Sequence, residues 1–224
     1  MDGSPVNGPN RRELAAEDAR NRILAAATDC LVRDGLAKVR MAAIAREAGV
    51  SSGLLHYHFD TKEQLFAEVL AWSSAASAEL TAQALAQAGD EPAQRLAAFL
   101  DRCLPSDEAL AHEWLLWQEL ALLCMREPDL ATVSAELYED LYATGARLVE
   151  KGISGGVFDL PSTEARRVAE TALALCDGLG GRVLSAGEAL TIEQARTMVA
   201  EGVGQLVGHD GPLPISHRLR QVRA

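Results

Sequence analysis

The residues best suited to chemistry lie in one short run near the N-terminal end. The imidazole of His56 and the phenol of Tyr57 offer hydrogen-bonding groups of the kind that reach base edges in a DNA groove. Lys62 follows closely and carries an ammonium that could pair with a backbone phosphate. The candidate nucleic-acid contacts are Arg40, Ser51, Ser52, Gly53, Leu54, His56, Tyr57 and Lys62.

Two short helices joined by a tight turn would position these residues. We expect helices over 41–48 and 52–58, with Gly49 adopting the left-handed conformation of the turn and Ser51 capping the second helix. Ala45 is small enough for the helices to cross closely, as a helix-turn-helix requires. The residues expected to face the shared core are Ile44, Ala48, Val50 and Leu55.

Charge is divided unevenly along the chain. The formal net charge is −11, yet residues 1–62 hold nine basic and eight acidic side chains. The remaining 162 residues carry twelve basic and twenty-four acidic side chains. A polyanion would be repelled by this larger part, so only the first quarter of the chain is suited to meet DNA.

The rest of the chain is predicted to be helical. Proline is absent from 11–91, and four later prolines separate long apolar-periodic segments without strand alternation. The expected helices are 13–34, 62–88, 92–103, 107–126, 129–154, 162–186 and 191–208, besides the two short ones. We predict an all-α protein with a disordered arm over 1–10, a three-helix DNA-binding domain over 11–62, a helical-bundle domain over 63–208 and a loose tail over 209–224.

An enzyme has little support in this sequence. Residues 152–156 match G-x-S-x-G, but a long helix precedes them where a nucleophile elbow needs a strand. The four cysteines have no metal-ligand spacing, and no H-E-x-x-H is present. We therefore predict no catalytic residue, no metal and no cofactor. No segment is apolar enough to span a membrane, and the first ten residues lack a signal core, so we expect a cytoplasmic protein.

A ligand site is predicted inside the helical bundle, between residues 92 and 181. Trp114 and Trp117 lie three residues apart on one helical face, and aromatic faces can hold a cation. Core packing is an equally good explanation of both. The expected lining residues are Phe99, Trp114, Trp117, Cys124 and Asp177. A cationic or amphipathic organic ligand is our preference, with a neutral apolar ligand as the close alternative.

The segment GVSSGLLHYHFDTKEQLF resembles the recognition-helix signature of the TetR family of one-component bacterial regulators. The family usually has Tyr where this chain has His56, followed by an aromatic or His, then His-Phe and a Lys three residues on. His58, Phe59 and Lys62 match, and the His56-Tyr57 variant resembles the BetI-like branch, typified by a choline-responsive repressor. Looser similarity to this branch extends through Asp177-Gly178-Leu179.

This resemblance implies a regulator that binds a palindromic double-stranded DNA operator as a homodimer and is released by a small organic ligand. It also implies pairing of residues 162–186 and 191–208 with their copies. A single recognition helix reads too few base pairs for genomic specificity, which independently favours a two-fold dimer. A helical enzyme and an interaction protein without DNA binding remain as alternatives.

Overall fold

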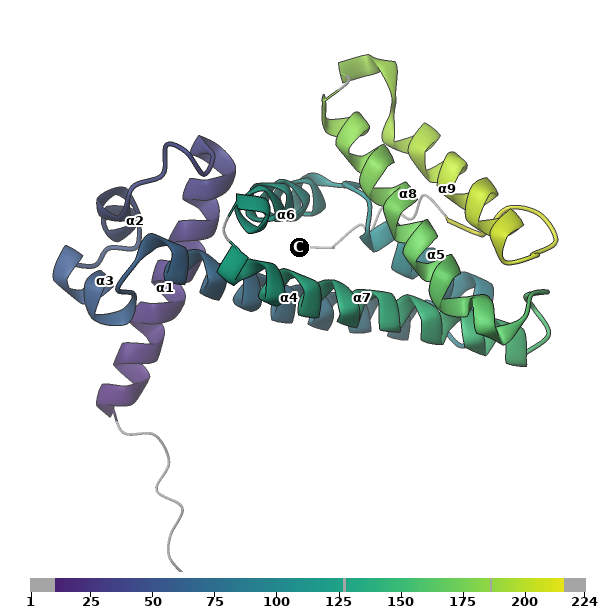
Figure 1. Cartoon of the computed structure of the whole chain (residues 1–224), viewed down its shortest axis with the longest axis horizontal. Helices are drawn as coiled ribbons and strands as arrows, with labels where there is room; N and C mark the ends of the chain where they lie inside the picture. The colour runs from purple at the N-terminus through teal and green to yellow at the C-terminus, as the bar shows by residue number, and fades with distance from the viewer. Residues whose placement is uncertain (1–10, 127, 186, 216–224) are drawn as a thin grey trace, which may run out of the picture. The chain divides into compact units, whose positions relative to one another are not determined.

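The computed structural model describes residues 11–126, 128–185 and 187–215, and the predicted all-α class is confirmed. No strand occurs in these ranges (Figure 1). The α-helices and two short 3-10 helices are α1 (Arg11–Asp34), α2 (Met41–Glu47), α3 (Ser52–His58), α4 (Lys62–Gln87), α5 (Pro92–Arg102), α6 (Glu108–Arg126), α7 (Pro128–Ser154), η1 (Ser162–Glu164), α8 (Ala165–Ser185), η2 (Gly187–Ala189) and α9 (Ile192–Leu206).

The chain divides into two compact units, and three helices contribute to both. The N-terminal unit comprises the described part of Met1–Ser73 together with Leu116–Leu130. The C-terminal unit comprises Ser74–Leu115 and the described part of Ala131–Ala224. The division falls within α4, α6 and α7, and the domain boundary expected after residue 62 stays a prediction.

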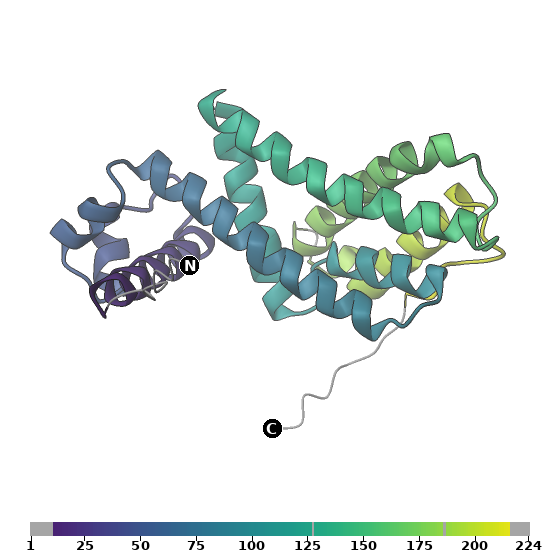
Figure 2. The ribbon, with the colours of Figure 1, turned by 90° about the horizontal axis from the view of Figure 1, so that it is seen from below.

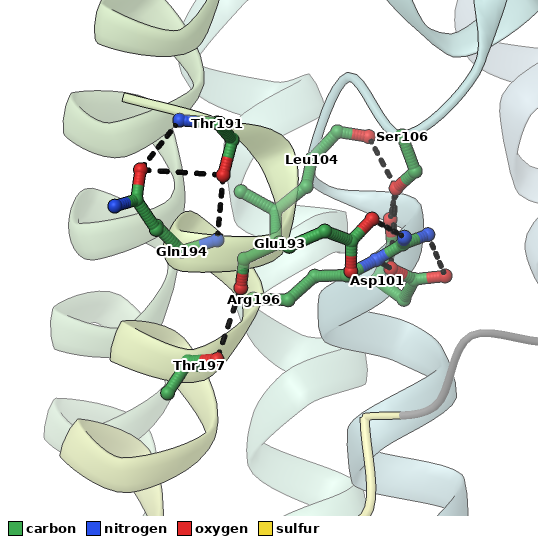
Figure 3. Close-up of polar contacts among 8 residues, drawn as sticks. All are labelled: Asp101, Leu104, Ser106, Thr191, Glu193, Gln194, Arg196 and Thr197. Carbon is green, nitrogen blue, oxygen red and sulfur yellow. Dashed lines mark hydrogen bonds and ion pairs between the residues drawn. The ribbon is translucent and has the colours of Figure 1, made fainter. Parts of the chain in front are cut away.

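Helix ends follow from local capping. Thr191 and Gln194 form a capping box at the start of α9 (Figure 3). Glu91, rather than its neighbour Asp90, caps α5, because its carboxylate accepts from two backbone N–H groups. Asp107 accepts from Leu110 N at the start of α6, whereas the hydroxyl of Ser106 donates to Asp101.

The N-terminal unit is built on the apolar face of α1. The helix pattern 23, 24, 27 and 31 is fully buried, as the predicted supporting helix requires. Leu65, Phe66 and Val69 of α4 are also buried. In Figure 1 the short helices α2 and α3 lie beside α1, in agreement with the contacts among these three helices.

The core of the C-terminal unit is formed mainly by α5, α8 and α9. Figures 1 and 2 show α8 and α9 side by side, and a continuous apolar cluster extends from both helices to α5. At its edge, the largely buried guanidinium of Arg196 on α9 donates to Asp101 at the end of α5 over 2.8 Å (Figure 3). Such a charge-assisted bond fixes the register of α9 against α5.

The two terminal segments differ in how much of each the structure describes. The predicted arm over 1–10 lies outside the described residues, as does 216–224. Residues 209–215, which were expected to be loose, instead return to the core: Leu213 is buried and its N–H donates to Ala200 O over 3.0 Å. Leu213 and Ile215 both pack against the apolar cluster of the C-terminal unit, which explains the difference.

Candidate nucleic-acid interface and ligand site

The motif predicted over 41–60 has the geometry of a helix-turn-helix. Gly49 has φ 65°, a left-handed conformation that favours glycine in this turn. Ser51 caps α3 by accepting a hydrogen bond from Leu54 N at 3.1 Å. Ala45 and Leu55 are buried where α2 and α3 meet, which leaves the opposite side of α3 open to solvent.

The exposed side of α3 holds most of the predicted DNA contacts. Tyr57 is 78% exposed and Leu54 is 36% exposed. His56, Ser52 and Gly53 are exposed as well. The exposed surfaces of Leu54 and Tyr57 make no contact with the interior of the unit, so they are available to another molecule.

His58 and Phe59 support α3 instead of extending this surface. Phe59 is fully buried, and the guanidinium of Arg20 lies 5.9 Å from the centre of its ring. His58 is half-buried, and its desolvation together with the charge of Arg20 lowers the pKa of its imidazole. The two side chains therefore hold the end of α3 against α1.

Lys62 and Arg40 differ in what they contact. Arg40 is exposed at the N-cap of α2, where its side chain makes no capping hydrogen bond. The ammonium of Lys62 is half-buried and donates to Leu36 O over 2.9 Å. It also lies 5.3 Å from the centre of the Phe66 ring. One of the three ammonium donors of Lys62 is thus used within the chain, and the phosphate contact expected from the sequence stays a prediction.

The backbone of Leu36 forms hydrogen bonds with side chains from two helices. Its carbonyl accepts from Lys62 at the start of α4, and its N–H donates to Glu119 Oε2 of α6 over 2.8 Å. Leu36 lies in the turn between α1 and α2, directly before the helix-turn-helix. We call this arrangement of Leu36, Lys62 and Glu119 the Leu36 clamp. Sequence reasoning missed Glu119 because its partner is 83 residues away.

A charged cluster links α1 to α2. The guanidinium of Arg33 donates to both carboxylate oxygens of Glu47 over 2.9 Å, and the thiol of Cys30 donates to the same carboxylate. These hydrogen bonds, that of Arg33 first, lower the pKa of Glu47 to about 2. Burial, followed by the Glu47 carboxylate, raises the pKa of the Cys30 thiol, which keeps this cysteine protonated.

The five predicted ligand-site residues divide between the two units. Phe99 is 1% exposed and packs in the core of the C-terminal unit beside Gly145, and its role in lining a ligand site stays a prediction. Trp117 and Cys124 are half-buried and belong to the N-terminal unit. Trp114 and Asp177 belong to the C-terminal unit.

Trp114 lies against α8 at two consecutive glycines. A Cβ atom at Gly180 would stand 2.7 Å from the indole nitrogen of Trp114, and one at Gly181 would stand 3.2 Å from the far edge of the ring. Asp177 precedes these glycines by one helical turn on the same side of α8. The absence of side chains at 180 and 181 is therefore what allows the indole to lie beside Asp177.

Asp177 carries a carboxylate to which a cation could bind. It is exposed, not buried as sequence reasoning supposed, and it has no hydrogen bond or ion pair within the described parts of the chain. Enough protein surrounds it that partial desolvation raises its pKa. Its charge in turn contributes to the raised pKa of Tyr142 on α7 and to that of Cys103, which burial raises to about 12.

Tyr142 and Cys103 are therefore residues on which the charge of Asp177 acts, and sequence reasoning missed both. Tyr142 has Tyr138 one turn away at a ring-centroid distance of 5.9 Å, a spacing visible in the sequence as an i, i+4 pair on α7. The guanidinium of Arg166 lies 5.0 Å from the Tyr142 ring centre. Trp114, Asp177 and Tyr142, from three helices, and Cys103, at the end of α5, are referred to below as the Asp177 cluster.

Metal and membrane sites are not evident in the described ranges. No group of three or more His, Cys, Asp or Glu side chains there is arranged to hold a metal ion. None of the described helices combines the length and the apolar character that crossing a membrane requires. The G-x-S-x-G match ends a helix: α7 runs to Ser154, and Gly156 follows with φ 68°.

Both parts of the chain match known families. Residues 23–69 match the family "Bacterial regulatory proteins, tetR family". Residues 92–208, just over half of the chain, match "BetI-type transcriptional repressor, C-terminal". The first match covers the helix-turn-helix, and the second covers the helices that carry the Asp177 cluster.

Individual relatives are similar to this chain over most of their lengths. The HTH-type transcriptional regulators BetI of Ectopseudomonas mendocina and Agrobacterium fabrum are 29% and 30% identical, covering 79% and 71% of this chain and 87% and 74% of theirs. A crystal structure of a candidate transcriptional regulator from Saccharomonospora viridis in complex with choline has a TM-score of 0.76 at 26% identity, covering 88% of this chain and 98% of that one. A Rhodococcus transcriptional regulator gives 0.72 at 26% identity, covering 85% and 97%. The chain belongs to the TetR family of bacterial transcriptional regulators, in the branch with a BetI-type C-terminal domain, and it is not an enzyme.

Proposed function

We propose that this chain represses transcription in the cytoplasm by binding a palindromic operator through the exposed side of α3. The observation that carries this proposal is the division of α3 itself. Leu55 is buried against the supporting helices, while His56 and Tyr57 point two consecutive polar rings to solvent. A recognition helix in the major groove needs this arrangement. Arg40, Ser51, Ser52, Gly53 and Leu54 are the further proposed contacts, and Lys62 acts through the Leu36 clamp.

Selection from a pool of random DNA duplexes tests this proposal without knowledge of the target gene. The full chain is expected to enrich a two-fold symmetric sequence whose half-sites lie about one helical turn apart, or a multiple of it. A chain that enriches no sequence over the starting pool, at low salt as well as near 0.15 M, does not read DNA, and the proposal would then be wrong.

The homodimer is proposed to form through the outer sides of α8 and α9. Met198 is 47% exposed, and Leu184 and Leu206 are also large apolar side chains open to solvent. Gly178 has no atom within 4 Å of where its Cβ would be, so a second helix can approach α8 closely there. Val203 of α9 is 0% exposed and belongs to the core of its own chain, so it lies outside the proposed contact.

Met198→Glu is the variant that tests the dimer. It would place an unpaired carboxylate within the proposed contact while leaving the core of the chain untouched. Sedimentation velocity is expected to show a dimer for the unaltered chain and a monomer for the variant. Gln94→Glu, on an exposed site of α5, adds the same charge elsewhere and should leave the dimer intact. A dimer that survives Met198→Glu would contradict the placement.

The ligand is proposed to be an organic cation that binds at the Asp177 cluster. Asp177 offers a carboxylate without a partner, and Trp114 and Tyr142 offer aromatic faces close to it. A carboxylate and an aromatic face both favour a quaternary or protonated amine. The S. viridis neighbour, whose structure contains choline, supports this choice of ligand class. A neutral apolar ligand is the competing possibility.

Matched pairs of compounds decide between these ligand classes. Choline can be compared with 3,3-dimethylbutan-1-ol, which replaces the quaternary nitrogen with carbon at nearly the same shape. Calorimetry on the full chain is expected to show tighter binding of cations across a panel of such pairs, and Asp177→Asn is expected to remove the preference. Equal binding of charged and neutral partners, or preference for the neutral ones, would overturn the cationic assignment.

Helix α6 provides the proposed route from ligand to operator. It carries Trp114 of the Asp177 cluster and, further along, Glu119 of the Leu36 clamp. A cation that shifts Trp114 would move α6 and hence the turn before α2. Because a dimer must present both α3 helices at one fixed spacing, a small shift is enough to weaken operator binding.

A further inference from the structure

The exposed side of α3 lacks the groups that most often read guanine. No Lys or Arg occurs between Arg46 and Lys62, so α3 contains neither. Arginine and lysine donating to guanine O6 and N7 are the commonest base-specific contacts in the major groove. Leu54 and Tyr57 instead give this side a large apolar area.

The basic residues on either side of α3 do not fill this gap. Lys62 is committed to Leu36 O and to the face of Phe66. Arg40 and Arg46 are exposed but belong to α2 and its N-cap, and the first helix of this motif crosses the DNA backbone instead of entering the groove. Their guanidinium groups are therefore placed for phosphates.

Apolar side chains have one natural partner in the major groove, the C5-methyl group of thymine. We infer that α3 recognises its half-site chiefly through thymine methyl groups, which contact Leu54 and the ring of Tyr57, with His56 and Ser52 adding hydrogen bonds. This inference rests on the proposed binding of DNA by α3, and it specifies the chemical class of operator. Half-sites should contain thymines at positions next to each other or one base pair apart, since Leu54 and Tyr57 are one helical turn apart.

Replacement of thymine by uracil tests the inference on the DNA side. Uracil keeps every hydrogen-bonding group and removes only the methyl group, so the protein is left unchanged. In the duplex selected from the random pool, we expect one or two thymines per half-site at which uracil weakens binding by about fourfold each, the value of one buried methyl group. Methylating cytosines outside the half-sites serves as the control and should have no effect.

Variants of the protein assign each methyl group to a side chain. With Leu54→Ala, one uracil position is expected to lose its effect while the other keeps it, and Tyr57→Ala should show the reverse. Tyr57→Phe keeps the ring and should keep the uracil sensitivity. Leu54 and Tyr57 are exposed, so the helicity of these variants, followed by circular dichroism, should match that of the unaltered chain.

The possible results separate this inference from the function on which it rests. If a symmetric duplex is enriched but every uracil replacement changes binding by less than twofold, reading by thymine methyl groups is wrong and the operator proposal stands. A half-site dominated by guanines without a fixed thymine would overturn the inference in the same way. If no duplex is enriched at all, the operator proposal fails, and the inference fails with it.

Discussion

The two units of this chain place their functional residues in opposite ways. In the N-terminal unit, the proposed DNA contacts apart from Arg40 and Lys62 come from residues 51–57, and they are exposed to solvent. In the C-terminal unit, the Asp177 cluster takes one residue from each of α6, α7 and α8 and one from the end of α5. One site is local and exposed, whereas the other is assembled from distant segments.

This difference changes what a substitution can do. A residue on the outside of α3 can be altered with little effect on folding, because its neighbours do not depend on it. A residue at the Asp177 cluster touches other helices, so the same change disturbs packing as well as binding. Substitutions on the outside of α3 should therefore change binding without changing stability. Substitutions at the Asp177 cluster should change both.

Two glycine substitutions give the largest expected contrast in stability. Gly180→Ala would bring a methyl group to 2.7 Å from the Trp114 indole and 3.1 Å from Pro105, and we expect it to lower the free energy of unfolding by about 1–3 kcal/mol. Gly53→Ala meets only Ser51 Oγ at 4.0 Å, and alanine suits a helix better by about 1 kcal/mol. Urea denaturation of both variants measures the difference. Similar losses at the two sites would show that the contrast between the units is wrong.

Substitutions in the Leu36 clamp should have the next largest effect on stability. They also test how Lys62 contributes to operator binding. Glu119→Ala removes a carboxylate that accepts from Leu36 N, and we expect a loss of about 1.5 kcal/mol in unfolding free energy and weaker operator binding. Glu119→Gln keeps an acceptor oxygen and should recover part of both. Lys62→Met should weaken operator binding while leaving the salt dependence unchanged.

The salt dependence is the outcome that distinguishes the two roles of Lys62. A direct phosphate contact would contribute about 0.9 to the slope of log affinity against log salt concentration. If the slope for Lys62→Met is smaller by that amount, Lys62 makes the phosphate contact expected from the sequence. An unchanged slope with weaker binding is expected if the ammonium acts by holding Leu36.

Asp177→Asn should make the C-terminal unit more stable while it weakens cation binding. Partial desolvation raises the pKa of Asp177 above 3.8, so folding disfavours its charged form. That penalty is fully present at neutral pH and disappears as the pH falls through the raised pKa. The variant should therefore unfold at a higher temperature at pH 7, with the difference vanishing below pH 3.8. Asp140→Asn, an exposed site on α7, is the control. A less stable Asp177→Asn at pH 7 would contradict this account.

The smallest effect is expected at Glu47, because its ion pair with Arg33 lies at the surface. The lowered pKa of Glu47 means that its charged form stabilises the fold above about pH 4.5, and this contribution is lost as the pH falls from 4.5 to about 2. Glu47→Gln should thus be less stable than the unaltered chain at pH 7 and equally stable at pH 2. Thermal denaturation at both pH values measures this, and a difference that persists at pH 2 would point to packing.

The sequence was sufficient for the helices, and it failed where distant residues meet. Helical periodicity, prolines and caps place the helices to within about three residues because these signals act between near neighbours. Tyr142 and Cys103 could not be found in this way, since their link to Asp177 depends on how α5, α7 and α8 pack. The same reason explains Phe99, whose apolar character fits a core and a ligand site equally well. Leu213 and Ile215 show that two apolar residues can order a segment otherwise rich in proline and glycine.

The central claim is that α3 reads DNA, and the double variant His56→Ala/Tyr57→Ala tests it most directly. Fluorescence anisotropy on the selected duplex and on a scrambled duplex, at one salt concentration, gives the specificity ratio of the dimer. The account predicts that specific affinity falls by at least about 100-fold, because contacts are lost in both half-sites, while binding of the scrambled duplex, helicity and dimerisation stay unchanged. A double variant that binds the selected duplex as tightly as the unaltered chain would contradict the account.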